Sequence, residues 1–187
     1  MVYGSPGLAN DYPRKSKVNV VRWVVPGWGS TNVANGGQLV QNQIRYTPIF
    51  VEETTLYIRI GCDVVQSAIG VSTLDIRIFA DANGLPGALI LDCGNVDTQA
   101  APGFREIVIA QTLTRGYYWL AYRTAINDIC ILRALSAAAS PLRGSYDTQG
   151  MYERPCSIVV GAWADPAPAP TAVQSAAYAA SLWLREN

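Results

Sequence analysis

The chain has 187 residues, half of them apolar or aromatic, which fits one folded domain with or without an extension and excludes an intrinsically disordered protein. Its 14 Lys+Arg balance its 14 Asp+Glu, so the overall charge gives no reason to expect nucleic acid or an acidic membrane as a partner. The absence of histidine excludes a His general base, Ser-His-Asp and Cys-His nucleophile systems, and any His-ligated metal.

The N-terminal segment, residues 1–36, differs in composition from the rest of the chain. It is rich in proline and glycine, and it shows no apolar stretch of the kind that a signal peptide requires. Its one apolar run, residues 18–25, can pair as a strand. The remainder cannot bury enough apolar surface by itself, so we interpret residues 1–36 as an extended N-terminal arm. The candidate partner-binding residues of this arm are Tyr12, Arg14, Lys15, Lys17, Arg22, Trp23 and Trp28.

Residues 37–187 show the pattern of a single all-β domain. Residues 55–62 alternate strictly, which predicts a strand with Leu56, Ile58 and Ile60 facing the core, and residues 74–79 repeat the pattern. Further predicted strands cover residues 105–110, 117–122, 129–132, 157–160 and 181–185. Short strands separated by frequent turns predict an antiparallel β-sandwich, jelly-roll-like, without a substantial helix. The helix-tolerant residues 172–181 follow a proline-rich stretch and are interpreted as a loop.

Three motifs have a structural and a functional interpretation. Residues 81–87 open like a calcium loop, but Leu85, Pro86 and Gly87 offer no side-chain oxygen, so we predict a tight turn with Gly84 and Gly87 at positive φ. The adjacent pair Glu52-Glu53 is assigned to a turn, because neighbouring strand residues face opposite ways and cannot form a glycosidase pair. The aromatic run 117–122 is interpreted as core packing, with a sugar-binding platform as the alternative.

The four cysteines, Cys62, Cys93, Cys130 and Cys156, do not form a CxxC motif, so a zinc ribbon is not expected. Cys62 continues the alternation of its strand and is predicted to be a buried small hydrophobe. Free thiols are the expectation for a chain without a secretion signal, and oxidation after release of a particle stays open.

The charged residues are few and biased in type. Only 15% of the chain is charged, against about a quarter in an average soluble domain, and all cationic residues except Lys15 and Lys17 are arginine. Protein interfaces favour Arg, Tyr and Trp and avoid Lys, which indicates a surface that is covered in the working state. A GC-rich genome would produce the same bias. For the basic cluster of the arm, an acidic protein neighbour is favoured over nucleic acid.

Short motifs of the body form a recognisable set. In residues 74–91 a strand runs into the turn Asp-Ala-Asn-Gly-Leu-Pro-Gly and continues into an apolar strand. Further motifs of the set are residues 46–62, 93–98, 113–121, 133–136 with 140–142, and 182–185. Together they resemble a β-sandwich module of tail-fibre and other structural proteins of tailed bacteriophages. The resemblance covers about residues 39–187 and implies a phage structural module without catalytic residues, whose place on the virion varies.

These observations favour a virion protein that decorates or cements the capsid, assembled in the host cytoplasm. The sandwich would form a homo-oligomer, most plausibly a trimer, and the arm would lie over the major capsid protein or other virion proteins. The alternative is a tail-fibre or receptor-binding module that recognises a host surface glycan, although the chain has no repeats or heptads. An enzyme such as a depolymerase is disfavoured. No cofactor, metal, nucleic acid or membrane partner is expected.

Overall fold

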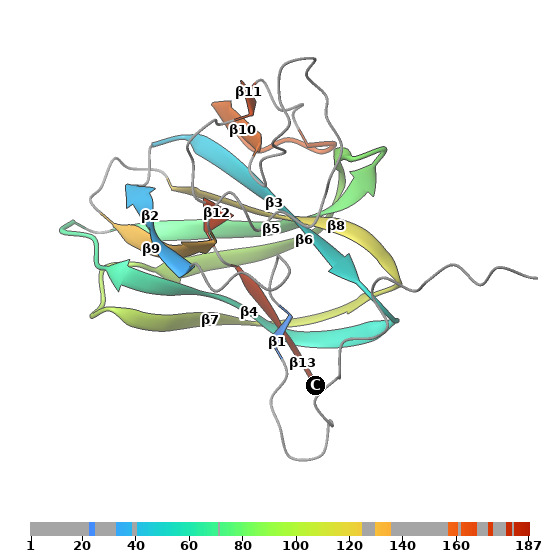
Figure 1. The fold of residues 1–187 in the computed structure, drawn as a ribbon, viewed down its shortest axis with the longest axis horizontal. Coiled ribbons are helices and arrows are strands. Elements are labelled where there is room, and N and C mark those ends of the chain that lie inside the picture. The colour runs from blue at the N-terminus through green and yellow to red at the C-terminus, as the bar shows by residue number, and fades with distance from the viewer. Residues whose placement is uncertain are drawn as a thin grey trace, which may run out of the picture.

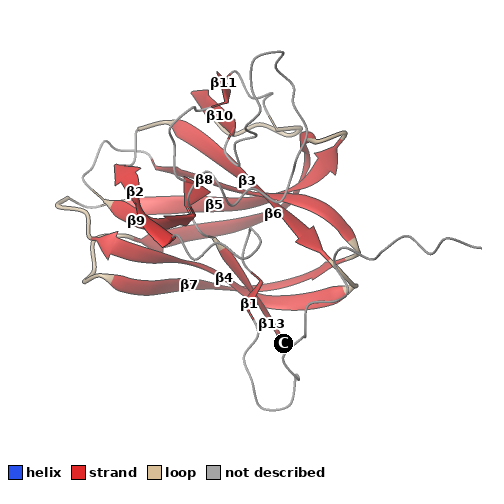
Figure 2. Cartoon of the chain, in the orientation of Figure 1, coloured by secondary structure: helices blue, strands red, loops and turns tan. Residues whose placement is uncertain are grey.

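The computed structural model describes residues 23–24, 33–38, 41–70, 72–124, 130–135, 157–160, 162–167, 172–173, 179–180 and 182–187. Within these residues every regular element is a β-strand, and none is a helix (Figure 2). The strands form two antiparallel sheets that pack face to face, which confirms the predicted β-sandwich (Figure 1).

Sheet A is organised around its longest strand, β4. Along one edge β4 pairs with β7, and along the other it pairs with β13 and then with β9. The members of sheet A are β1 (Trp23–Val24), β2 (Val33–Gln38), β4 (Thr55–Gln66), β7 (Gly103–Leu113), β9 (Ile131–Leu135), β12 (Ala179–Ala180) and β13 (Trp183–Glu186).

Sheet B has a simple linear order, β11-β10-β3-β8-β5-β6. Its members are β3 (Gln43–Val51), β5 (Thr73–Ala82), β6 (Leu85–Asp97), β8 (Gly116–Thr124), β10 (Ser157–Val160) and β11 (Ala172–Val173). Because the chain changes sheet after β2, β3, β4, β6, β7, β8, β9 and β11, most strand partners are distant in sequence, as in a jelly roll.

The main core lies between the sheets, where the alternating apolar residues of both meet. Leu74, Ile76 and Ile78 on β5 are fully buried there, which confirms the inward face predicted for this strand. Ile109 on β7 is buried and Ile107 packs against the same cluster, so the strand predicted over residues 105–110 is confirmed and turns both isoleucines to the core.

The face assignment of β4 is wrong at its first residues. Leu56 is 40% exposed, whereas Tyr57 is only 2% exposed and belongs to the core. The cause is a register shift between Tyr57 and Arg59, seen in the pairing with both β7 and β13. Beyond the shift the expected alternation returns, and Ile60 and Cys62 are buried.

Two parts of the predicted arm are strands of sheet A. β1 pairs with β13, and β2 pairs with β9. The proposed boundary between residues 36 and 37 stays a prediction, because most of the arm lies outside the described residues. Residues 172–181, interpreted as a loop, include the two-residue strands β11 and β12, which pair with β10 and β9.

Candidate functional site

A second apolar cluster lies on the outer face of sheet B and is covered by residues 162–167, here called the strap. Its members are Ile44, Tyr46, Phe79, Trp119, Ala121 and Ala167, with Leu89 and Trp163 packed against them. The Leu89 N–H donates to Asp165 Oδ1 at 2.9 Å, and the Ala167 N–H donates to the Gly87 carbonyl at 2.8 Å. One side-chain and one main-chain acceptor therefore hold the strap against β6.

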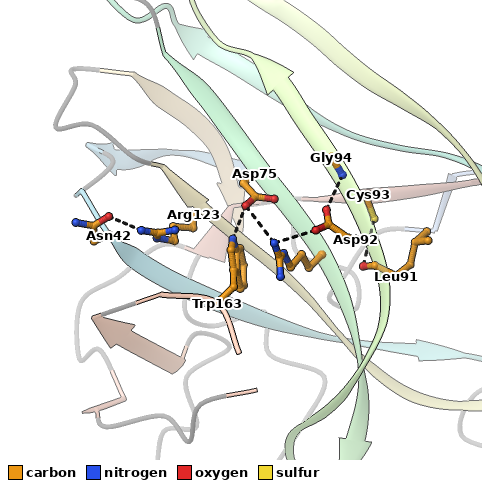
Figure 3. Close-up of polar contacts among 9 residues, drawn as sticks. Asn42, Asp75, Leu91, Asp92, Cys93, Gly94, Arg123 and Trp163 are labelled. Carbon is orange, nitrogen blue, oxygen red and sulfur yellow. Dashed lines mark hydrogen bonds and ion pairs between the residues drawn. The ribbon is translucent and has the colours of Figure 1, made fainter. Parts of the chain in front are cut away.

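Trp163 attaches the strap to β5. Its ring stacks on Phe79 at a centroid distance of 6.0 Å, and the Arg77 guanidinium lies 4.6 Å from the ring centroid. Its indole N–H donates to Asp75 Oδ2 (Figure 3). Stacking, cation–π attraction and a charge-assisted hydrogen bond thus act on one side chain.

The charges around Asp75 balance each other. Arg77 lies 2.8 Å from Asp92 Oδ2 and 3.7 Å from Asp75 Oδ2, and Arg123 donates to Asn42 Oδ1 at 2.5 Å (Figure 3). Burial raises the pKa of the Asp75 carboxyl, while the Trp163 hydrogen bond and the Arg77 charge oppose this rise. Asp75 Oδ2 and both oxygens of Asp92 therefore face donors of the protein, since Asp92 Oδ1 also accepts the Gly94 N–H at 3.1 Å.

The outer face of sheet A carries a different cluster. Phe104 on β7 packs against Trp183 on β13 at a centroid distance of 4.8 Å. Glu106 Oε2 lies 3.4 Å from Arg59 Nε and 3.7 Å from an Arg185 guanidinium nitrogen. Phe104 is 65% exposed and Val108, two positions beyond Glu106, is 70% exposed. This aromatic, apolar and arginine-containing combination is typical of a protein interface.

The turn between β5 and β6 uses its acidic residue internally. Asp81 Oδ2 accepts the Gly84 N–H at 3.0 Å, and Asp81 Oδ1 accepts the Trp119 indole N–H at 2.9 Å. Asn83 and Gly84 have φ angles of 57° and 83°, which confirms positive φ at Gly84. The prediction for Gly87 is wrong, since its φ is not positive. A Cβ there would lie 2.8 Å from the Ala82 Cβ, so close packing explains this glycine.

The other sequence candidates lie apart from these clusters. Glu52 and Glu53 occupy the connection between β3 and β4, as predicted. In the aromatic run, Trp119 and Tyr122 are buried, which confirms core packing. Tyr117 is 44% exposed and lies against Phe50 at a centroid distance of 4.7 Å.

The described cysteines are buried free thiols. Cys62, Cys93 and Cys130 are each at most 8% exposed. Burial raises the pKa of Cys62 and Cys93 to about 12, so both thiols are protonated at neutral pH. The predicted hydrophobic role of Cys62 is confirmed, and Cys156 lies outside the described residues.

Most of the predicted arm site also lies outside the described residues: Tyr12, Arg14, Lys15, Lys17, Arg22 and Trp28. Trp23 belongs to β1, where its backbone pairs with Arg185 of β13. The sequence reasoning missed both surface clusters. The alternation of β5 places Asp75 and Arg77 on one face, but Trp163 is 88 residues from Asp75 and no local pattern connects them.

Comparison of the chain with protein-family models, with curated proteins and with solved structures finds no match in any of the three. Within the described ranges, no group of three acidic or cysteine side chains is placed to hold a metal ion. The same part of the chain contains no helix that is long and apolar enough to span a membrane.

Proposed function

We propose that this chain is a non-catalytic structural protein of a bacteriophage virion, which decorates the head by binding across neighbouring major capsid subunits. The observation that carries the proposal is the outer face of sheet A, where Phe104 and Val108 are 65% and 70% exposed beside the Arg59–Glu106–Arg185 group. Exposed large apolar residues rimmed by charge mark protein interaction surfaces. The resemblance of residues 39–187 to phage structural modules supports the same role.

Decoration requires binding but no reaction. A stable sandwich supplies a rigid surface, and symmetry on a particle repeats each weak contact many times, so the sum is strong. The low content of charged residues fits a protein whose surface is largely covered after assembly. The same logic favours a homo-oligomer, for which the sequence reasoning proposes a trimer.

The basic residues of the N-terminal arm are the proposed contact with an acidic capsid neighbour. Arg14, Lys15 and Lys17 precede β1, so they can extend from the body while β1 and β2 stay paired in sheet A. Charged contacts at the rim of an interface steer association and set its salt dependence.

A charge reversal in the full-length protein tests this proposal. We expect Lys15→Glu to weaken binding to capsids that lack the protein by about fivefold or more, because a like charge would face the acidic neighbour. Arg115→Glu reverses one charge at the exposed turn between β7 and β8 and serves as the control. Co-sedimentation with purified capsids at low and high salt measures both variants. Equal binding of Lys15→Glu and Arg115→Glu would exclude the arm contact.

A receptor-binding role at the tail is the second candidate. The specific observation in its favour is the exposed Tyr117 beside Phe50, because aromatic rings of this kind can stack on sugar rings. That role predicts binding to a glycan array and few copies at the tail, whereas decoration predicts many copies on the head and no glycan ligand.

A further inference from the structure

The strap contacts sheet B with every second residue. Trp163 is half-buried and stacks on Phe79. The Asp165 carboxylate accepts the Leu89 N–H, and Ala167 is buried in the cluster beneath the strap. The residues between these three are exposed: Ala162, Ala164 and Pro166. Contact through alternate side chains is the way in which a sheet recognises a bound peptide, so the strap occupies sheet B as a peptide ligand would.

The strap also uses the edge of sheet B. β6 is the last strand in the order of this sheet, so no strand among the described residues pairs with its outer edge. Two main-chain groups of β6, the Leu89 N–H and the Gly87 carbonyl, bond to the strap at 2.9 and 2.8 Å. A side-chain oxygen of Asp165 accepts the first of these bonds, in the role that a carbonyl has in an added strand. An aspartate is therefore part of what this edge binds.

The second group that sheet B binds is the indole of Trp163. Three alternate residues of β5 contact it: Phe79 by stacking, Arg77 through its guanidinium at 4.6 Å, and Asp75 by accepting the indole N–H (Figure 3). Phenylalanine could fill the same space but would leave Asp75 without this donor. The edge of β6 and these three residues of β5, here called the strap site, thus select tryptophan followed two residues later by aspartate.

Tyr46 adds a donor that the strap does not use. Its side chain is fully buried in the cluster beneath the strap, and its ring centroid lies 5.8 Å from that of Phe79. Its hydroxyl has no hydrogen-bond partner among the residues that the structure describes. Burial raises the pKa of this phenol, so the hydroxyl is protonated at neutral pH and can donate. Because an unpartnered buried hydroxyl costs free energy, an occupant that supplies an oxygen here gains a contact that the strap lacks.

We propose that the strap site is a docking site for a short segment of a partner protein that carries tryptophan and, two residues later, aspartate, and that the strap occupies the site until such a segment displaces it. The strap itself identifies this ligand, because its tryptophan and aspartate are the groups that the site binds. Displacement requires the loss of few contacts, since half of the six strap residues are exposed and the strap contains no strand. The inference does not rest on the virion role.

Peptide binding to a strap-released variant tests the proposal. Trp163→Ala combined with Asp165→Ala in the full-length protein removes both side-chain contacts of the strap. We expect a synthetic peptide of residues 161–168 to bind this variant with half-saturation at about 1 mM, as a short linear segment does. The NMR amide shifts of Gly87 and Leu89 measure the binding. The wild type should bind the peptide about tenfold more weakly or less, because its own strap competes at a high effective concentration.

Two controls separate docking from non-specific association. Ala162→Ser combined with Ala164→Ser changes two exposed strap residues and should leave peptide binding as weak as in the wild type. A peptide in which the tryptophan and the aspartate are both replaced by alanine should not shift the amides of the released variant. Equal binding of the two peptides, equal binding by the wild type and the released variant, or no binding by the released variant at about 10 mM peptide would each overturn the proposal.

Amide exchange in the wild type gives a second readout that needs no variant. The Leu89 and Ala167 N–H groups both bond across the contact between the strap and β6, so one opening event exposes both. We expect them to share one protection factor, at least about tenfold below that of the slowest amides of β5 and β8. Exchange of both groups only through global unfolding would show that the strap does not leave a folded body, and would overturn the proposal.

Discussion

At the scale of single residues, Asp75 and Trp163 show how one carboxylate can fix a distant segment. Asp75 accepts the Trp163 indole N–H, and Arg77 beside it covers the same ring at 4.6 Å. The cost of this arrangement is desolvation of the carboxylate, which raises the pKa of Asp75 despite the favourable hydrogen bond and the Arg77 charge.

This raised pKa predicts a pH-dependent stability. The contribution of Asp75 is fully present below the pKa of the unfolded chain and is lost as pH rises through the higher pKa of the folded state. We therefore expect the free energy of unfolding of the wild type to rise relative to that of Asp75→Asn as pH falls from about 7 to about 4. The neighbouring charged residues Arg77, Asp92 and Arg123 are the same in both proteins. Urea unfolding over this range measures the difference. Asp97→Asn on β6 is the control for replacing a carboxyl group by an amide. A stability difference between the wild type and Asp75→Asn that stays constant or shrinks as pH falls would contradict the assignment to Asp75.

At the scale of elements, Gly61 allows β4 and β7 to approach each other beneath the outer cluster of sheet A. It pairs with Glu106, and a Cβ at this position would lie 2.5 Å from the Arg105 carbonyl oxygen. Real Cβ atoms do not approach a backbone oxygen so closely, so the two strands would have to separate. The Arg59–Glu106 contact joins these two strands, and the Phe104–Trp183 contact joins β7 to β13 on the other side of β4, so both contacts would shift.

The close approach predicts a specific stability effect. We expect Gly61→Ala to destabilise the fold by about 1–3 kcal/mol, as overpacking against a rigid backbone does. Gly70→Ala is the matched control, because a Cβ there meets no atom within 4 Å, and its effect should stay within about 0.5 kcal/mol. Chemical denaturation measures the free energy of unfolding of the two variants. Equal values would show that Gly61 is not required for the close approach of β4 and β7.

Much of the element scale could be predicted from the sequence, because alternation is a local property. The inward face of β5 followed directly from Leu74, Ile76 and Ile78. The start of β4 could not be assigned correctly, because the shift between Tyr57 and Arg59 depends on pairing with β7 and β13. The two surface clusters were missed for the same reason: Phe104 and Trp183 meet only after distant strands have joined sheet A.

At the scale of the whole molecule, the two sides of the sandwich differ. The strap covers an apolar cluster on the outer face of sheet B, whereas sheet A presents exposed Phe104 and Val108. The covered outer face of sheet B contributes to stability, and the exposed outer face of sheet A is available for association. This asymmetry supports the proposal that the protein acts through contact with its own copies and with a larger particle.

The most direct test is an electron cryomicroscopy map of the virus particle with this chain traced in it. The proposed function predicts many copies on the outside of the head, with residues of the N-terminal arm against neighbouring capsid subunits. A map that places a few copies at the tail tip, or a particle that contains no copy of the chain, would contradict the central proposal.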